Sequence, residues 1–143
     1  RALATIEGVM YLIDAQGELF KRHVEGDPHD LPIVTGIDPD AVARDREGVA
    51  MMVRRALELM SDLEQAKIAE RHPLQELHLE ADGSLTVVVG STGLSLVFGI
   101  PPYRSKVAKA ARILEELRFR KVESAVLFLD NKAHPERVVV RMK

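Results

Sequence analysis

The chain has 143 residues, of which 46% are hydrophobic, and its 20 basic and 22 acidic side chains give a formal charge of −2. This length suits a single folded domain spanning residues 1–143, and the hydrophobic content excludes a disordered segment. The balanced charge, with no Trp, two Tyr and four Phe, argues against a nucleic-acid-binding protein. The absence of cysteine excludes disulfides, thiol nucleophiles and cysteine-bound metals.

The sequence contains no candidate membrane span, because no apolar run approaches the ~20 residues that a spanning helix needs. The chain begins with Arg1 rather than Met, so we expect a piece of a longer protein, and any anchor or signal would lie upstream of this piece. A chain without cysteine suits both reducing and oxidising compartments, so the composition does not indicate where the protein resides.

The N-terminal part predicts a small hairpin followed by a returning strand. Two short apolar runs, 2–6 and 9–13, meet near Gly8. Residues 14–17 form a predicted turn, because Asp bonds its own downstream backbone and Gly supplies a positive φ. Residues 18–21 then read as the returning strand.

A polar loop and a long helix are predicted next. Residues 23–30 are polar and contain Gly and Pro, whereas 31–34 are apolar and extended. Asp38 caps a predicted helix that begins at Pro39 and ends before Pro73. Steps of three and four dominate among its apolar positions and predict one buried stripe: Val42, Val49, Met52, Val53, Ala56, Leu57, Met60, Leu63 and Ile68.

Residues 74–99 predict three antiparallel strands with one buried face. Tight turns are expected at 82–83 and 90–93, where Asp-Gly and Gly-rich segments interrupt the apolar alternation. The alternating apolar positions are Leu77 and Leu79, then Leu85, Val87 and Val89, then Leu94, Leu96 and Phe98.

The chain closes with a second helix at 104–118, a strand at 124–129, a turn at 130–135 and a final strand at 136–142. In that strand Val138, Val140 and Met142 share one face, and Val139, Arg141 and Lys143 share the other. The order of elements predicts an α+β fold: a mostly antiparallel twisted sheet with two helices packed on one face, preceded by a small N-terminal hairpin.

Candidate cation sites compete with simpler interpretations. Asp27, His29 and Asp30 could touch a cation, but a solvated loop accounts for them better. Asp14, Gln16 and Glu18 have the alternate spacing that opens a calcium loop, but the later glycine and closing Glu are out of register, so a turn is preferred. The sequence offers no set of nucleophile, base and oxyanion donor, and we expect no enzyme activity, metal or cofactor.

The second helix and its exit are basic. They could steer an acidic partner or lipid headgroups, although a solvated helix face is the usual explanation. The residues concerned are Arg104, Lys106, Lys109, Arg112, Arg118, Arg120 and Lys121.

The final strand is the feature for which a functional interpretation competes evenly. If it lies at the sheet edge, its unpaired backbone groups could accept a strand from a partner. Alternatively, Arg141 and Lys143 guard the edge against aggregation. Residues alone do not separate these two hypotheses.

Three patterns in a fixed order carry a resemblance. Leu12-Ile13-Asp14 is followed by Gly17 and Phe20, Leu31-Pro32 by Gly36, and Leu129-Asp130 by the closing Val138–Arg141 run. Pro102, Lys106 and the Leu114–Leu117 segment add the pattern of a second helix. Together they resemble the extracytoplasmic C-terminal (beta) domain of the bacterial FtsQ/DivIB cell division family.

The resemblance implies a non-catalytic scaffold of the division septum in the cell inner membrane, single-pass, with this domain on the periplasmic side. An upstream POTRA-type domain and a membrane anchor, not in this chain, would precede it. The family binds the coiled-coil proteins FtsB and FtsL through a strand added to the last strand of this domain, and so helps regulate septal peptidoglycan synthesis. Carried over, the partner-binding residues would be Asp130, Asn131, Lys132, Val138, Val139, Val140, Arg141 and Met142.

The chain departs from the family at two points. Lys132 stands one position later than the basic residue that some members place after the aspartate, and the last strand has no aromatic ring. The alternative hypothesis is a related envelope assembly module that binds extended peptides weakly and promiscuously. The scaffold hypothesis predicts that Val139→Pro abolishes partner binding, because proline removes a ladder donor.

Overall fold

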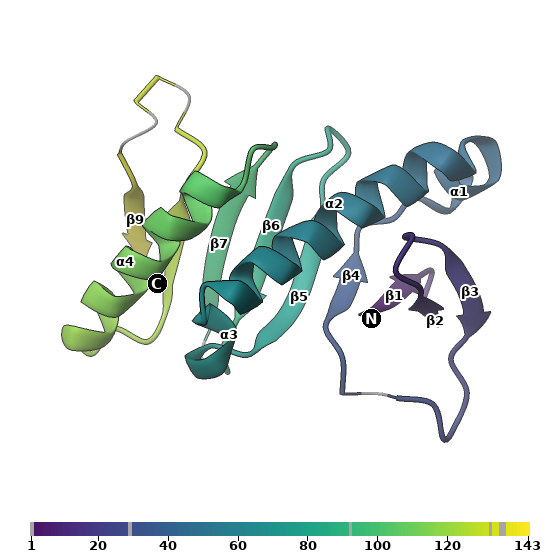
Figure 1. Ribbon diagram of the computed structural model, residues 1–143, viewed down its shortest axis with the longest axis horizontal. Helices are drawn as coiled ribbons and strands as arrows, with labels where there is room; N and C mark the ends of the chain where they lie inside the picture. The colour runs from purple at the N-terminus through teal and green to yellow at the C-terminus, as the bar shows by residue number, and fades with distance from the viewer. Residues whose placement is uncertain (1, 29, 92, 132, 135–136) are drawn as a thin grey trace.

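The computed structural model describes residues 2–28, 30–91, 93–131, 133–134 and 137–143 (Figure 1). Its strands form one nine-stranded sheet in the order β3-β2-β1-β4-β5-β6-β7-β8-β9. The strands are β1 (Ala2–Ile6), β2 (Val9–Ile13), β3 (Leu19–Arg22), β4 (Ile33–Thr35), β5 (Leu74–Leu79), β6 (Leu85–Val89), β7 (Leu94–Gly99), β8 (Ala125–Phe128) and β9 (Val139–Met142). The helices are α1 (Pro39–Arg44), α2 (Arg46–Gln65), α3 (Ile68–Arg71) and α4 (Arg104–Phe119).

The sheet is mostly antiparallel, as predicted for an α+β fold. Parallel pairing occurs where β4 lies between β1 and β5, and again where β8 lies beside β7. β1 and β2 pair antiparallel across Glu7 and Gly8, and both belong to the same sheet as every later strand. The first strands are therefore a continuation of the main sheet rather than a unit ahead of it.

The prediction of a single helix between Pro39 and Pro73 is wrong, because the chain forms three helices there. Asp45 leaves helical geometry, and its side chain accepts a hydrogen bond from the Gly48 N–H at 3.0 Å, which starts α2. A Cβ at Gly48 would collide with the Asp45 carboxylate, so glycine fits this cap. Lys67, with a φ of 63°, separates α2 from α3. Val42 and Val49 stand seven residues apart across the first break, about two helical turns, so the apolar stripe continues there, whereas a five-residue step from Leu63 to Ile68 spans the second break.

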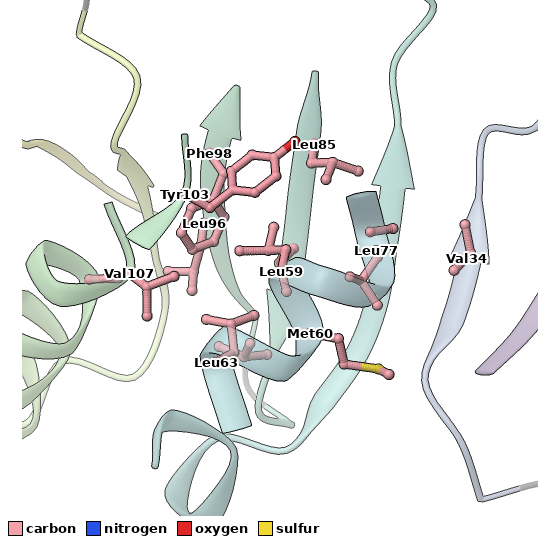
Figure 2. Close-up of a cluster of buried hydrophobic side chains, with 14 of the residues drawn as sticks. Val34, Leu59, Met60, Leu63, Leu77, Leu85, Leu96, Phe98, Tyr103 and Val107 are labelled. Atoms are coloured by element: carbon pink, nitrogen blue, oxygen red, sulfur yellow. The ribbon is translucent and has the colours of Figure 1, made fainter. Parts of the chain in front are cut away.

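Figure 1 shows α2 and α4 crossing the same side of the sheet. Figure 2 shows the core between the helices and the sheet, where Leu59 and Leu63 of α2 meet Leu96 and Phe98 of β7. The Phe98 and Tyr103 rings pack edge to face, with centroids 6.5 Å apart. The alternating residues predicted for β6 and β7 are all buried, which confirms their period-two pattern.

None of the helices in the described part of the chain is both long enough and apolar enough to cross a membrane.

Candidate functional site

Strand β9 lies at one end of the sheet, as predicted for the last strand of the chain (Figure 1). It pairs antiparallel with β8, with Val139 opposite Phe128 and Met142 opposite Ala125. No strand of the described residues pairs with its other side. The strand begins at Val139, later than the predicted start at 136, and residues 135–136 lie outside the described part of the chain.

Two hydrogen bonds fix which backbone groups of β8 face β9. On one side, the Leu129 N–H donates to the Val97 carbonyl at 2.9 Å, so Leu129 faces β7. On the other side, the Lys143 N–H donates to the Ser124 carbonyl at 3.5 Å, so Ser124 faces β9. Because backbone direction alternates along a strand, every second residue from Ser124 onward, including Phe128, turns its N–H and carbonyl toward β9.

The same alternation assigns the backbone groups of β9. Arg141 stands opposite Val126 in the register, so its N–H and carbonyl point inward to β8. The groups of Val139 point inward for the same reason. Those of Val140 and Met142 therefore point to the open edge. A partner strand would meet an N–H and a carbonyl from each of these two residues.

The side chains of β9 divide between the two faces of the sheet. Val138 and Val140 are half-buried and pack against the core on the helix side, and Met142, on that side too, is 58% exposed. On the other side Val139 is 53% exposed, and the Arg141 guanidinium lies 5.6 Å from the centre of the Phe128 ring. The distance to Phe128 suits a cation–π interaction.

The predicted turn residues lie between β8 and β9. The Asn131 Oδ1 accepts a hydrogen bond from the His134 N–H at 3.0 Å, which closes part of this turn. The Asp130 side chain packs against Gly99, where a Cβ would collide with it, and the Gly99 φ of 71° also favours glycine. Lys132, the remaining predicted residue of this turn, lies outside the described residues.

Two lysines of α4 border the same cavity as this turn, and the sequence pattern did not assign them to it. Asp130 and Asn131 line a cavity of about 650 Å³ together with Lys106 and Lys109. The Lys106 Nζ donates to the carbonyls of Phe98, at 2.9 Å, and Ile100, at 2.6 Å. The sequence did contain a signal for this arrangement: Lys106 and Lys109 are three residues apart, which places both on one face of α4.

The other candidates for a binding site behave as local structure. Asp14 Oδ1 accepts the N–H groups of Gln16 and Glu18, each at 2.9 Å, which confirms the turn. Asp27 accepts a hydrogen bond from Lys21 at 2.8 Å, and this bond first, then one from the Val24 N–H, lowers the pKa of the Asp27 carboxyl.

His29, which the sequence placed in a possible cation-binding trio, lies outside the described residues. The described ranges contain no group of three or more His, Asp or Glu side chains that could hold a metal ion.

The basic patch on α4 is partly neutralised. Arg118 lies 3.5 Å from Glu115, and Arg120 lies 2.8 Å from Glu116. Both pairs are exposed and contribute little to stability. The patch is therefore less cationic than its count of basic residues indicates.

These features define an α+β domain whose last strand, β9, forms one open edge of the sheet. Comparison with known proteins adds the family. The protein-family model described as "Cell division protein FtsQ/DivIB, C-terminal" matches residues 2–130 of this chain. The chain therefore belongs to the FtsQ/DivIB family of cell division proteins. The match includes β8 and ends before β9.

Several curated relatives are named cell division protein FtsQ. The chain is 33% identical over 135 residues to the protein of Anaeromyxobacter sp. (strain K), covering 94% of this chain and 46% of that protein. It is 34% identical to the protein of Myxococcus fulvus, and the match covers 94% of this chain and 47% of that protein. It is 32% identical to the protein of Geotalea daltonii, and the match covers 78% of this chain and 40% of that protein. The chain thus spans about half the length of the curated relatives it matches.

Proposed function

We propose that this domain is a non-catalytic scaffold of the bacterial division septum that binds FtsB and FtsL by strand addition on β9. Through this contact it helps regulate septal peptidoglycan synthesis. The domain, with its two long helices packed on one face of the sheet, lies on the periplasmic side of the inner membrane. An upstream POTRA-type domain and a single-pass anchor hold it there.

The observation that carries the proposal is the direction of the backbone at the open edge. Val140 and Met142 present their N–H and carbonyl groups where no described strand pairs with them. Strand addition uses such groups for affinity and adjacent side chains for selectivity. Membership of a cell division family supports a partner within the division complex.

The remaining predicted residues take supporting roles in this proposal. Val138 and Val140 anchor β9 to the core from the helix side. Asp130, Asn131 and Lys132 belong to the connection that leads into β9, and the partner would contact them where its chain passes the end of the added strand. Val139 and Arg141 offer side chains on the opposite face.

Amide hydrogen exchange, with and without the extracytoplasmic segments of FtsB and FtsL, tests the proposal. We expect new protection within 130–143, largest at the amides of Val140 and Met142. The amide of Arg141 already faces β8 and should change less. The amides of β3, the opposite edge of the sheet, serve as an internal control and should not change.

No change in exchange anywhere in a folded domain would rule out strand addition by these partners. Similar weak protection by many unrelated extended peptides would favour the alternative function, an envelope assembly module that accepts strands promiscuously. A single tight partner would argue against that alternative.

A further inference from the structure

The C-terminal ends of α2 and α4 lie at the same end of the domain, beside the short helix α3 (Figure 1). Two cavities occupy this surface. One, of about 550 Å³, is lined by residues of α3 and α4, and the other, of about 460 Å³, is lined by the last turns of α4 and the residues that follow. Arg71, His72 and Leu114 line both cavities, so the two adjoin. Residues 66–72 and 111–123 are called the α3–α4 end below.

The α3–α4 end is cationic, although the whole chain has a formal charge of −2. The side chains that line the two cavities include five basic and three acidic ones. The basic ones are Lys67, Arg71, Arg112, Arg118 and Lys121, and the acidic ones are Glu70, Glu115 and Glu123. Glu115 lies between Arg71, at 3.7 Å, and Arg118, at 3.5 Å, so one negative charge serves two cations. Lys67 and Lys121 form no ion pair with any described residue.

These two lysines occupy backbone positions that favour glycine. Lys67 follows α2 with a φ of 63°, and Lys121 follows α4 with a φ of 60°. After α4, the Val122 N–H donates to the Leu117 carbonyl at 2.8 Å, and the Lys121 N–H donates to the Arg118 carbonyl at 3.0 Å. Glycine usually closes a helix in this way, because a Cβ destabilises the left-handed backbone. Side chains kept in such a conformation at a cost in stability indicate a functional use.

An aromatic ring projects beside these cations. Phe119, the last residue of α4, is 85% exposed, more than any other large hydrophobic side chain in the described part of the chain. The segment 118–121 combines this one ring with three basic residues. Leu117 is buried and Val122 packs against the core, so the core is closed here without the Phe119 ring.

A protruding ring among cations fits the surface of a lipid bilayer. Where the headgroups are anionic, basic side chains meet the lipid phosphates and an aromatic side chain enters the apolar layer beneath them. Fluid acyl chains accommodate a ring without a preformed pocket. A small soluble anion would use the cations and leave the ring in water.

We propose that the α3–α4 end docks on a membrane surface that contains anionic phospholipid. Phe119 inserts below the headgroups, and Lys67, Arg118 and Lys121 contact their phosphates. This contact uses no residue of β9, so it goes beyond the proposed function and does not depend on strand addition. If an anchor holds the domain near a membrane, even a weak contact orients it, because the effective concentration of lipid is high.

Fluorescence tests the insertion of the ring. The chain contains no tryptophan, so Phe119→Trp introduces a single probe. The 143-residue protein is mixed with vesicles of phosphatidylcholine alone, or of phosphatidylcholine and phosphatidylglycerol in equal parts. We expect a blue shift of the emission, and quenching by lipids brominated in their acyl chains, with the anionic vesicles only.

Phe20→Trp is the matched control for the probe. Phe20 is 54% exposed and is followed by Lys21 and Arg22, so its local chemistry is similar. It lies on β3, at the other end of the molecule in Figure 1. Its emission should not shift with either kind of vesicle.

Co-sedimentation with anionic vesicles measures the affinity of further variants. Phe119→Ala should weaken binding by about tenfold. Lys67→Gly and Lys121→Gly should each weaken it by about fivefold at low salt, and less at high salt. Both glycine variants should unfold at the same or a higher urea concentration than the natural chain, because glycine suits their backbone. Weaker binding by a protein of equal or greater stability excludes a damaged fold as the cause.

Absence of binding, equal binding to the two kinds of vesicle, or an unshifted Phe119→Trp emission on anionic vesicles would overturn the inference. Unchanged affinity of Phe119→Ala, or of the Lys67→Gly and Lys121→Gly double variant, would also overturn it. Binding of soluble polyglutamate without binding of vesicles would assign this end to an acidic protein and overturn the membrane contact. None of these outcomes decides strand addition, which amide exchange with the FtsB and FtsL segments tests separately.

Discussion

Proline at two neighbouring positions of β9 should produce different defects. Arg141→Pro removes an N–H that faces β8 and leaves the Val126 carbonyl without its donor. The lost hydrogen bond contributes about 1 kcal/mol, and an unpaired acceptor adds about 1–3 kcal/mol. We therefore expect a loss of about 2–4 kcal/mol, a large fraction of the ~5–15 kcal/mol that stabilises a domain.

Val140→Pro removes an N–H that faces the open edge, and proline is tolerated on edge strands in this orientation. Its cost to the isolated domain should be limited to the half-buried side chain, about 1 kcal/mol. Partner affinity should fall by about tenfold to a hundredfold, because one ladder hydrogen bond is lost and the ring stands in the path of the added strand.

Urea unfolding followed by circular dichroism measures the stability change, and titration with the FtsB and FtsL segments measures binding. Arg141→Ala and Val140→Ala separate the loss of each side chain from the loss of its N–H. Equal destabilisation by the two prolines would show that the assigned backbone directions are wrong. Unchanged partner affinity of a folded Val140→Pro protein would refute strand addition. Val139→Pro is a weaker test than the sequence indicated, because the Val139 N–H faces β8.

Three further predictions concern the rest of the domain. Phe98→Ala should cost about 3–5 kcal/mol in urea unfolding, because this side chain is fully buried, whereas Phe119→Ala, at 85% exposure, should stay within about 0.5 kcal/mol. Tyr103→Phe should leave the free energy of unfolding unchanged or raise it by up to ~1 kcal/mol, because the described residues give its buried hydroxyl no partner; a clear loss would reveal one. Burial, reinforced by the charge of Arg71, lowers the pKa of His72 below its usual 6.5, so the unfolded chain takes up the proton first and stability should fall as pH drops below about 6.5. Urea midpoints at pH 7.5 and 5 should show His72→Gln losing part of this slope, and an unaltered slope would contradict the assignment.

Local patterns in the sequence identified the strands, because period-two alternation reflects one buried face. Leu85, Val87 and Val89 illustrate this, since each is buried between partly exposed neighbours. The broken helix was missed for the opposite reason. Val42 and Val49 stay in phase across Asp45, so only the backbone geometry at Asp45 separates α1 from α2. Across Lys67 the apolar step is five residues, from Leu63 to Ile68, but one irregular step does not reveal the left-handed backbone there.

Pairing between distant strands could not be predicted in the same way. The parallel placement of β4 between β1 and β5 depends on contacts such as that of the Leu3 N–H with the Pro32 carbonyl, at 2.9 Å. Residues 29 positions apart leave no periodic signal. The edge position of β9 could be predicted from its place in the chain order, but the direction of each backbone group depends on its register with β8.

The short strand β9 also shields its neighbour. Without β9, the new border of the sheet would be β8, in which Ala125, Val126 and Leu127 are buried. An apolar border of this kind recruits other chains indiscriminately and leads to aggregation. In β9 the exposed Arg141 stands at the border instead. In the proposed function, the strand that would admit a partner thus also covers an apolar border that would otherwise favour aggregation.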